Sequence, residues 1–240
     1  MHHLEAGETT LDEGASKYVA RVRRLREGDT LLLFHPREAM EAEATIVEIG
    51  RSAVRCRVHE VRASTIRAER PVTLVQAAGK GDKLDAVVRD ATELGATRVV
   101  VAESLRSVVR LHVKSEERLQ RLRRVADEAA RQCGRGDAPD VMGPLPWSEA
   151  LRIEPGEHAL KLCFWERATD PAGPELLGLR ADQPLVVAAG PEGGLDEAEI
   201  DAARASGFTV VSLGPFILRT ETVAAAVLGA ALLLGAKKSP

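Results

Sequence analysis

Short apolar runs alternate with amphipathic stretches along most of the chain, and this alternation predicts an α/β fold with a mostly parallel sheet covered by helices on both faces. The apolar runs predict strands at residues 72–77, 98–102, 158–165, 185–189 and 208–213. The 3.6-residue pattern and its capping signals predict helices at 82–94, 115–132, 147–151 and from 196 onward. Residues 168–183, rich in Pro and Gly, predict a loop.

The first 70 residues show a different hydrophobic pattern from the rest of the chain. Residues 4–70 contain short β-type runs at 30–34, 44–49 and 53–59, separated by turns, which predicts a small β-barrel. Pro71 cannot continue a helix and opens a new extended run, so the boundary between two domains is expected at 70/71. The predicted domains are therefore 1–70 and 71–240.

Two glycine-punctuated loops, residues 189–195 and 213–222, each lie between a predicted strand and a predicted helix. In the first loop, Asp196 and Glu199 have the spacing of a capping box, and Leu195 can pack on Ile200. Gly193 and Gly194 permit positive φ and close approach of a ligand to the backbone. Parallel sheets bind ligands outside the carboxyl ends of their strands, so both loops are candidates for one binding site.

Residues 223–234 are almost wholly apolar, so this helix is expected to be buried or shared with a partner, although it is too short to span a bilayer. Hydrophobic residues make up 45% of the chain and the net charge is -3, which does not favour nonspecific attachment to nucleic acid. Without a signal peptide, a membrane-length run or a CxxC pair, the cytoplasm is the expected location.

Several classes of site are excluded by missing motifs. No GxGxxG follows a strand, and no His, Cys or Asp cluster has metal-ligand spacing. The segment around Gly79 fails the Walker pattern twice, because Leu74 stands where a glycine is needed and Gly81 where Ser or Thr is needed. Nicotinamide, nucleoside triphosphate and metal enzymes are therefore not favoured.

The segments 190–194 (GPEGG) and 213–222 (LGPFILRTET) resemble the two signature loops of the SPOUT methyltransferases, and more narrowly the bacterial uridine-N3 methyltransferases of small-subunit (16S) ribosomal RNA of the RsmE type. The resemblance implies a C-terminal trefoil-knotted α/β domain, a small N-terminal PUA-like β-barrel, S-adenosylmethionine as cofactor and a homodimer without metal or membrane. The cofactor-binding residues that it implies are Ala189, Gly190, Pro191, Glu192, Gly193, Gly194, Leu213, Gly214, Ile217, Leu218, Arg219 and Thr220.

Basic and polar residues in three places are candidates for binding ribosomal RNA, within the small ribosomal subunit: Arg21, Arg23 and Arg24; Lys80 and Lys83; and Arg131, Gln132 and Arg135. The simpler interpretation is a solvated charged face for the first group, a loop followed by an amphipathic helix for the second, and a solvated helix end for the third.

For transfer of a methyl group to uridine N3, the N3 proton must leave while negative charge spreads over the uracil oxygens. Arg219 is the candidate for stabilising that charge, and Glu221 or Glu192 for accepting the proton or orienting the cofactor. Alternatively, Arg219 and Glu221 pair only to hold the loop. Phe216 stands where the family usually has an arginine, so a cationic contact is either lost or replaced by stacking on a base.

Two other functions remain open. One is that of another SPOUT enzyme, which would methylate a tRNA base or a ribose 2′-hydroxyl. The other is that of a noncatalytic RNA-binding assembly factor that keeps the pocket but has lost turnover.

Overall fold

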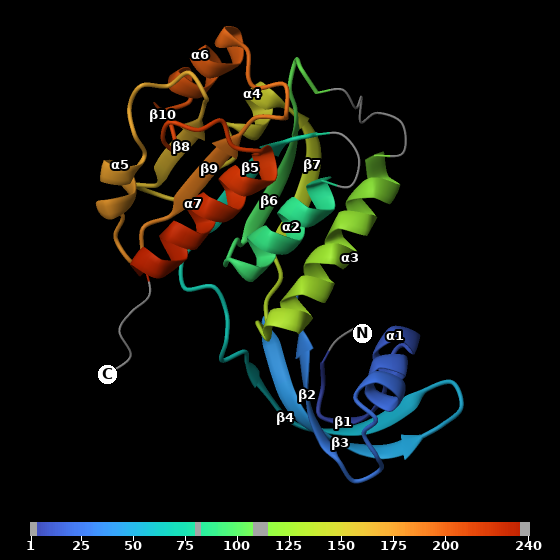
Figure 1. Ribbon diagram of the computed structural model, residues 1–240. Coiled ribbons are helices and arrows are strands. Elements are labelled where there is room, and N and C mark those ends of the chain that lie inside the picture. Colours follow the sequence, from blue (N-terminus) through green and yellow to red (C-terminus); the bar gives the residue numbers. More distant parts are fainter. Residues whose placement is uncertain (1–3, 80–82, 108–114, 236–240) are drawn as a thin grey trace. The chain divides into compact units, whose positions relative to one another are not determined.

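The computed structural model describes residues 4–79, 83–107 and 115–235, and these fall into two compact units (Figure 1). Unit 1 comprises Met1–Arg67 together with Gly134–Ala138, and unit 2 comprises Ala68–Cys133 and Pro139–Pro240. A short segment from the middle of the chain therefore belongs to the N-terminal unit. Sequence patterns favoured one contiguous N-terminal region because five residues carry no periodic signal.

Unit 1 is built on an antiparallel sheet with strand order β1-β4-β3-β2. Its elements are β1 (Gly7–Thr10), α1 (Glu13–Lys17), the π-helical turn η1 (Tyr18–Val22), β2 (Thr30–His35), β3 (Met40–Ile49) and β4 (Val54–Ala63). Alternate residues of β4, namely Val54, Cys56 and Val58, are buried in the core of this unit. The three predicted strands are present here, whereas β1 and the helical turns had no clear sequence signal.

The inserted segment Gly134–Ala138 is bound to unit 1 through its backbone. The Gly136 amide donates to the Ile66 carbonyl at 2.7 Å, and the Ala138 amide donates to the Pro36 carbonyl at 3.0 Å. The Ser64 hydroxyl donates to the Gly136 carbonyl at 3.4 Å. These bonds satisfy backbone groups that would otherwise need water or other partners.

Unit 2 contains a six-stranded parallel sheet with order β10-β8-β9-β5-β6-β7. Its strands are β5 (Val72–Ala77), β6 (Arg98–Glu103), β7 (Asp140–Pro146), β8 (Leu160–Phe164), β9 (Leu185–Ala189) and β10 (Thr209–Val211). Its helices are α2 (Lys83–Glu93), α3 (Ser115–Cys133), α4 (Trp147–Ala150), α5 (Gly173–Leu177), α6 (Glu197–Ala205) and α7 (Thr220–Gly235). The predicted parallel α/β architecture is confirmed.

The central strands are buried on both faces, which explains their continuous apolar runs. On one face, Leu74 and Val187 pack with residues of α2, α3 and α7. These three helices lie on the same side of the sheet in Figure 1. On the other face, Val75 and Val186 pack with residues of α4 and α6. The chain leaves β5 toward β6 and β7, and later returns to place β9 on its other side, so the strand order reverses beside β5.

Two elements of unit 2 were not predicted. Strand β7 contains Gly143 and Pro144, which signal a loop, but β7 lies at the edge of the sheet, where proline is tolerated. The five-residue helix α5 lies inside the stretch predicted to be a loop, and it begins at Gly173-Pro174, because proline suits the first turn of a helix.

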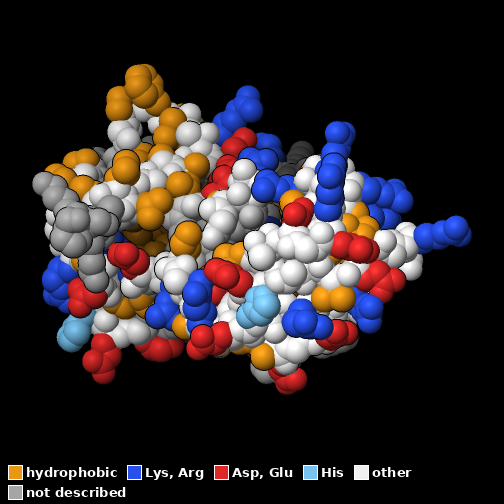
Figure 2. Space-filling view, turned by 90° about the horizontal axis from the view of Figure 1, so that it is seen from below, with side chains coloured by type: hydrophobic (Ala, Val, Ile, Leu, Met, Phe, Trp, Pro, Cys, Tyr) orange, Lys and Arg blue, Asp and Glu red, His pale blue; other side chains and the backbone are white. Residues whose placement is uncertain are grey.

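Helix α7 is only partly covered within the chain. Ala224, Val227, Leu228 and Ala231 are buried against the sheet and α2. The leucines near its end, Leu232, Leu233 and Leu234, are exposed, and hydrophobic side chains gather on part of the surface in Figure 2. None of the helices formed by the described residues is long and apolar enough to cross a membrane. The trefoil knot stays a prediction.

Candidate active site

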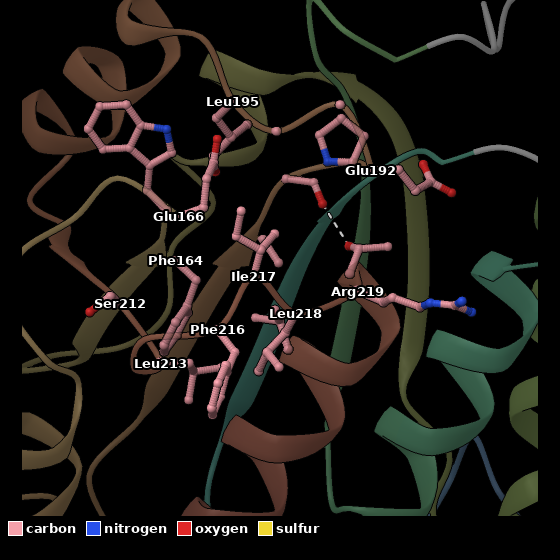
Figure 3. A pocket seen from close by; sticks show the side chains of 18 of the residues that line it. Phe164, Glu166, Glu192, Leu195, Ser212, Leu213, Phe216, Ile217, Leu218 and Arg219 are labelled. Carbon is pink, nitrogen blue, oxygen red and sulfur yellow. Dashed lines mark hydrogen bonds between the residues drawn. The ribbon is translucent and has the colours of Figure 1, made fainter.

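A cavity of about 460 Å³ lies at the carboxyl ends of β8, β9 and β10 (Figure 3). Three loops form it: the residues after β8, the first glycine loop after β9 and the second glycine loop after β10. Its lining comprises Lys83, Phe164, Trp165, Glu166, all residues from Ala189 to Leu195, all residues from Ser212 to Thr220, and Val223. Every residue predicted to bind the cofactor therefore lines this cavity.

The first loop requires its glycines. Gly194 has φ +72°, and a Cβ on Gly190 would lie 2.8 Å from Cγ of Leu195. The loop ends in the predicted capping box: the Asp196 side chain accepts from the backbone of α6, and the Asp196 amide donates to Oε2 of Glu199 at 2.9 Å. Leu195 and Ile200 lie in the same apolar cluster, as expected for a hydrophobic staple.

Arg106 holds the first loop from the side of β6. Its Nη1 donates to the Gly193 carbonyl at 3.1 Å, and its Nη2 pairs with Oδ2 of Asp196 at 3.2 Å. A Cβ on Gly193 would lie 3.2 Å from Cβ of Arg106, so the arginine stem also packs on the loop. Next to it, the Leu105 amide donates to Oε1 of Glu199 at 2.8 Å. Sequence reasoning missed Arg106, because no motif links it to a loop 87 residues further on.

Gln76 and Thr220 join the two glycine loops. The Thr220 hydroxyl donates to the Gly190 carbonyl at 2.7 Å, a bond drawn as a dashed line in Figure 3. Nε2 of Gln76 lies 2.8 Å from Oγ1 of Thr220 and 3.2 Å from the Gly190 carbonyl oxygen. Gln76 is only 1% exposed, in the middle of the sheet. It had no signal in the sequence beyond being a polar residue in an apolar strand, and that is a cue that could have identified it.

The charged side chains in and beside the cavity differ in their exposure and in their partners. Lys83 at the start of α2 pairs with Oε1 of Glu192 at 2.9 Å, and the Glu192 carboxylate packs directly on Gly79. Arg219 is exposed, and its side chain extends toward α2, away from Phe164 and Leu213 (Figure 3). Glu221 is not among the lining residues; its Oε2 is buried in the first turn of α7 without a hydrogen-bond partner in the described part of the chain. No ion pair between Arg219 and Glu221 occurs among the described residues.

The opposite part of the cavity is apolar. Phe164, Leu213 and Leu218 lie together in Figure 3, beside Phe216 and Ile217 at the tip of the second loop. Phe216 and Ile217 are 79% and 85% exposed, which is unusual for large apolar side chains beside a cavity. Such a surface suits the flat face of an aromatic ring, while the loop backbone offers hydrogen-bonding groups to its edge.

Neither a thiol nor a metal site contributes to this region in the described residues. Burial raises the pKa of the Cys163 thiol, one residue before Phe164, to about 12, so the thiol stays protonated and is a poor nucleophile. No group of His, Cys, Asp and Glu side chains within 4–79, 83–107 and 115–235 could hold a metal ion.

The residues predicted to bind RNA are distributed over both units. Arg21, Arg23 and Arg24 are exposed in and after η1, and Lys80 lies outside the described residues. Lys83 takes part in the pair with Glu192 described above. Arg131 and Gln132 are exposed in the last turn of α3.

Arg135 differs from the other RNA-binding candidates because it is buried in unit 1. Its Nε and Nη2 donate to the two carboxylate oxygens of Asp137 at 2.9 and 2.6 Å. This two-pronged pair gives Arg135 a role within the inserted segment. Its predicted contact with RNA stays a prediction.

Comparison with known proteins agrees with this geometry. The family model of an RNA methyltransferase domain matches residues 67–232, and that of an RNA methyltransferase PUA domain matches residues 11–58. The chain therefore belongs to this RNA methyltransferase family and carries an RNA methyltransferase PUA domain in its N-terminal part.

The relatives make the comparison more specific. The chain is 34% identical to Ribosomal RNA small subunit methyltransferase E of Mycobacterium bovis, over 91% of this chain and 83% of that protein. It is 30% identical to the Bacillus subtilis protein of the same name, over 85% and 82%. A Ribosomal RNA small subunit methyltransferase E from Neisseria gonorrhoeae, solved bound to S-adenosyl methionine, matches with a TM-score of 0.84 and 26% identity over 97% of this chain and 94% of that one.

Replacing Gln76 by Leu removes the amide that joins the two loops while keeping a similar side-chain volume. We expect the free energy of unfolding, measured by urea denaturation, to fall by about 1–3 kcal/mol, because the buried Thr220 hydroxyl and the half-buried Gly190 carbonyl lose a donor. The matched control is Gln120→Leu on the exposed side of α3, expected within about 0.5 kcal/mol of wild type. Equal effects of the two substitutions would contradict this role for Gln76.

Arg106→Ala removes both contacts to the first glycine loop. We expect amide hydrogen exchange of residues 190 and 192–195 to accelerate about tenfold, because local opening becomes easier. Arg106→Lys should restore little, since a lysine ammonium is a compact point charge and lacks the planar fork with which the guanidinium reaches both acceptors. Arg204→Ala is the control, because Arg204 also makes an exposed ion pair, but within α6, to Asp201 at 3.0 Å. Unchanged exchange in Arg106→Ala would show that the contacts of Arg106 do not hold the first loop.

Proposed function

We propose that this protein transfers a methyl group from S-adenosylmethionine to N3 of a specific uridine in 16S ribosomal RNA. The observation that carries the proposal is the cavity that both glycine loops line at the carboxyl ends of β8, β9 and β10, in a chain similar to proteins named for methylation of small-subunit ribosomal RNA. The cofactor is supported by the S-adenosyl methionine bound to the similar Neisseria gonorrhoeae protein.

The residues present fit such a cofactor. A volume of about 460 Å³ is in the usual range for a site that holds a nucleoside-sized molecule. The apolar surface of Phe164, Leu213 and Leu218 suits an adenine ring, and the backbone from Ala189 to Gly194 offers polar groups to the rest of the molecule. The bound cofactor would supply a methyl group already activated by a positively charged sulfur.

The chain has to position the uracil and stabilise its charge. N3 must lose its proton to accept the methyl group, and negative charge develops on the uracil oxygens as that proton leaves. This charge disappears again when N3 bonds to the methyl carbon and the electron pair of the carbon–sulfur bond returns to the cofactor's sulfur. Arg219 would stabilise that charge once its exposed side chain turns to the bound uridine. Two glutamates are the candidates for accepting the proton. Glu192 lines the cavity. Glu221 follows the cavity-lining Thr220 in the chain, and its Oε2 has no hydrogen-bond partner in the described part of the chain.

RNA would be held outside the cavity by basic side chains of both units. The exposed Arg21, Arg23 and Arg24 of unit 1 and Arg131 of unit 2 are suited to phosphate contacts. With a net charge of only -3, recognition would depend on the shape of the small ribosomal subunit in the cytoplasm rather than on a strong overall field. Phe216 at the loop tip would offer a stacking surface to a base.

The activity is tested by incubating the protein and radiolabelled S-adenosylmethionine with small ribosomal subunits that lack base methylation, followed by mass mapping of the label. We expect label at N3 of one uridine, and a decrease in kcat on the order of 100-fold in Arg219→Ala, because one charge-stabilising donor is lost. Arg204→Ala, distant from the cavity, should retain wild-type kcat. Label on a ribose would favour another reaction of the same fold, and cofactor binding without any label on ribosomal RNA would favour a tRNA substrate or a noncatalytic assembly factor.

We also propose a homodimer in which a second copy covers the exposed leucines at the end of α7. Light scattering at micromolar concentration should give twice the 25.8 kDa mass of one chain. Leu233→Glu should shift the mass toward one chain, because Leu233 is 79% exposed within the chain and a charge there would be buried in the interface. Glu175→Ala, on an exposed position of α5, serves as a neutral control. A single-chain mass for the wild type would refute the dimer.

A further inference from the structure

Glu166 is a glutamate at the cavity that belongs to neither glycine loop and to which the family comparison gives no role. It follows β8 and Trp165, lines the cavity, and is exposed to solvent. In Figure 3 its side chain extends toward Leu195, on the side of the cavity away from Phe216. Its carboxylate packs on the first glycine loop: a Cβ on Gly194 would lie 2.8 Å from Oε1 and 3.3 Å from Oε2. In this conformation the carboxylate occupies the space that a side chain at position 194 would need.

The other charges near this part of the cavity are already engaged. Glu192 pairs with Lys83, and Asp196 pairs with Arg106. Arg167, the neighbour of Glu166, lies 5.8 Å from the centre of the Trp165 ring and 3.7 Å from Oε1 of Glu197, so it is directed elsewhere. Within the described residues, Glu166 has no hydrogen bond or ion pair, and its carboxylate is free to accept one from a ligand.

The cavity therefore has two chemically different ends. Phe164, Leu213 and Leu218 form an apolar surface, while the loop carrying Gly193 and Gly194 is polar and has Glu166 beside it. S-Adenosylmethionine is divided in the same way: its adenine is flat, and its ribose hydroxyls and the ammonium of its amino-acid part are hydrogen-bond donors. With adenine on the apolar surface, these donors are directed to the polar end.

We propose that Glu166 is a cofactor-binding residue that accepts a hydrogen bond from a donor on the polar part of S-adenosylmethionine, either a ribose hydroxyl or the ammonium group. This assignment rests on the proposed function, because it takes S-adenosylmethionine as the ligand of the cavity. Gly194 would then have two roles: it adopts a positive φ, and its missing side chain lets the Glu166 carboxylate lie against the loop. A carboxylate that accepts from hydroxyl or ammonium donors makes strong, charge-assisted hydrogen bonds.

The test is calorimetric titration of wild type, Glu166→Ala and Glu166→Gln with three ligands: S-adenosylmethionine, S-adenosylhomocysteine and adenosine. We expect Glu166→Ala to raise the Kd for S-adenosylmethionine and S-adenosylhomocysteine at least about tenfold, which corresponds to loss of one charge-assisted hydrogen bond. Glu175→Ala is the matched control, an exposed glutamate that does not line the cavity, and it should leave every Kd unchanged. Melting temperatures of the ligand-free variants should equal that of wild type, because Glu166 makes no bond within the described chain.

The three ligands distinguish the two donors. If the donor is a ribose hydroxyl, adenosine binding weakens as much as that of S-adenosylhomocysteine, and Glu166→Gln keeps part of the affinity through its amide oxygen. If the donor is the ammonium, adenosine binding is unchanged and Glu166→Gln behaves like Glu166→Ala. Unchanged affinity of Glu166→Ala for all three ligands would overturn this assignment and leave the proposed function standing. Failure of the wild type to bind any of them would overturn both.

Discussion

The carbonyl group of Gly190 joins the two loops that make the cavity. It follows β9 at the start of the first glycine loop and accepts a hydrogen bond from the hydroxyl of Thr220, which begins α7. Gln76 approaches both groups from the middle of the sheet, so three segments of the chain meet at one oxygen. Because these groups are buried, a loop that moved away would leave polar atoms without partners, and the resulting cost fixes the distance between the two walls of the cavity.

Further contacts then orient the first loop from two directions. Lys83 pulls Glu192 toward α2, and Arg106 holds Gly193 and Asp196 from the end of β6. Both ion pairs are partly exposed, so each contributes little to the stability of the fold. Their effect is geometric: they hold a glycine-rich backbone, which would otherwise be mobile, in one conformation. A preformed loop of this kind avoids the entropy that a ligand would have to lose in ordering it.

Local sequence signals predicted the parts of this site that depend on near neighbours. The capping box of Asp196 and Glu199, the positive φ at Gly194 and the strands of the central sheet follow from spacing, cap chemistry and continuous apolar runs. Gln76, Arg106 and Glu166 could not be found in the same way. Gln76 meets Thr220 across 144 residues, and a contact at that separation leaves no periodic trace in the chain. Edge strand β7 was missed for a different reason, because its glycine and proline signal a loop.

The small segment Gly134–Ala138 determines how the chain can be divided. Since it is bonded to Ile66 and Pro36 of unit 1 while both of its flanks belong to unit 2, the backbone passes between the units three times, near residues 67, 134 and 138. A fragment ending at Arg67 would lack part of its own hydrogen-bonding surface, and unit 2 alone would carry an unpartnered five-residue excursion. The N-terminal unit that contains the RNA-methyltransferase PUA region is thus not a module joined by one linker. Insertions, fusions or shuffling that treat it as one would separate residues 4–67 from the segment Gly134–Ala138 that completes the unit.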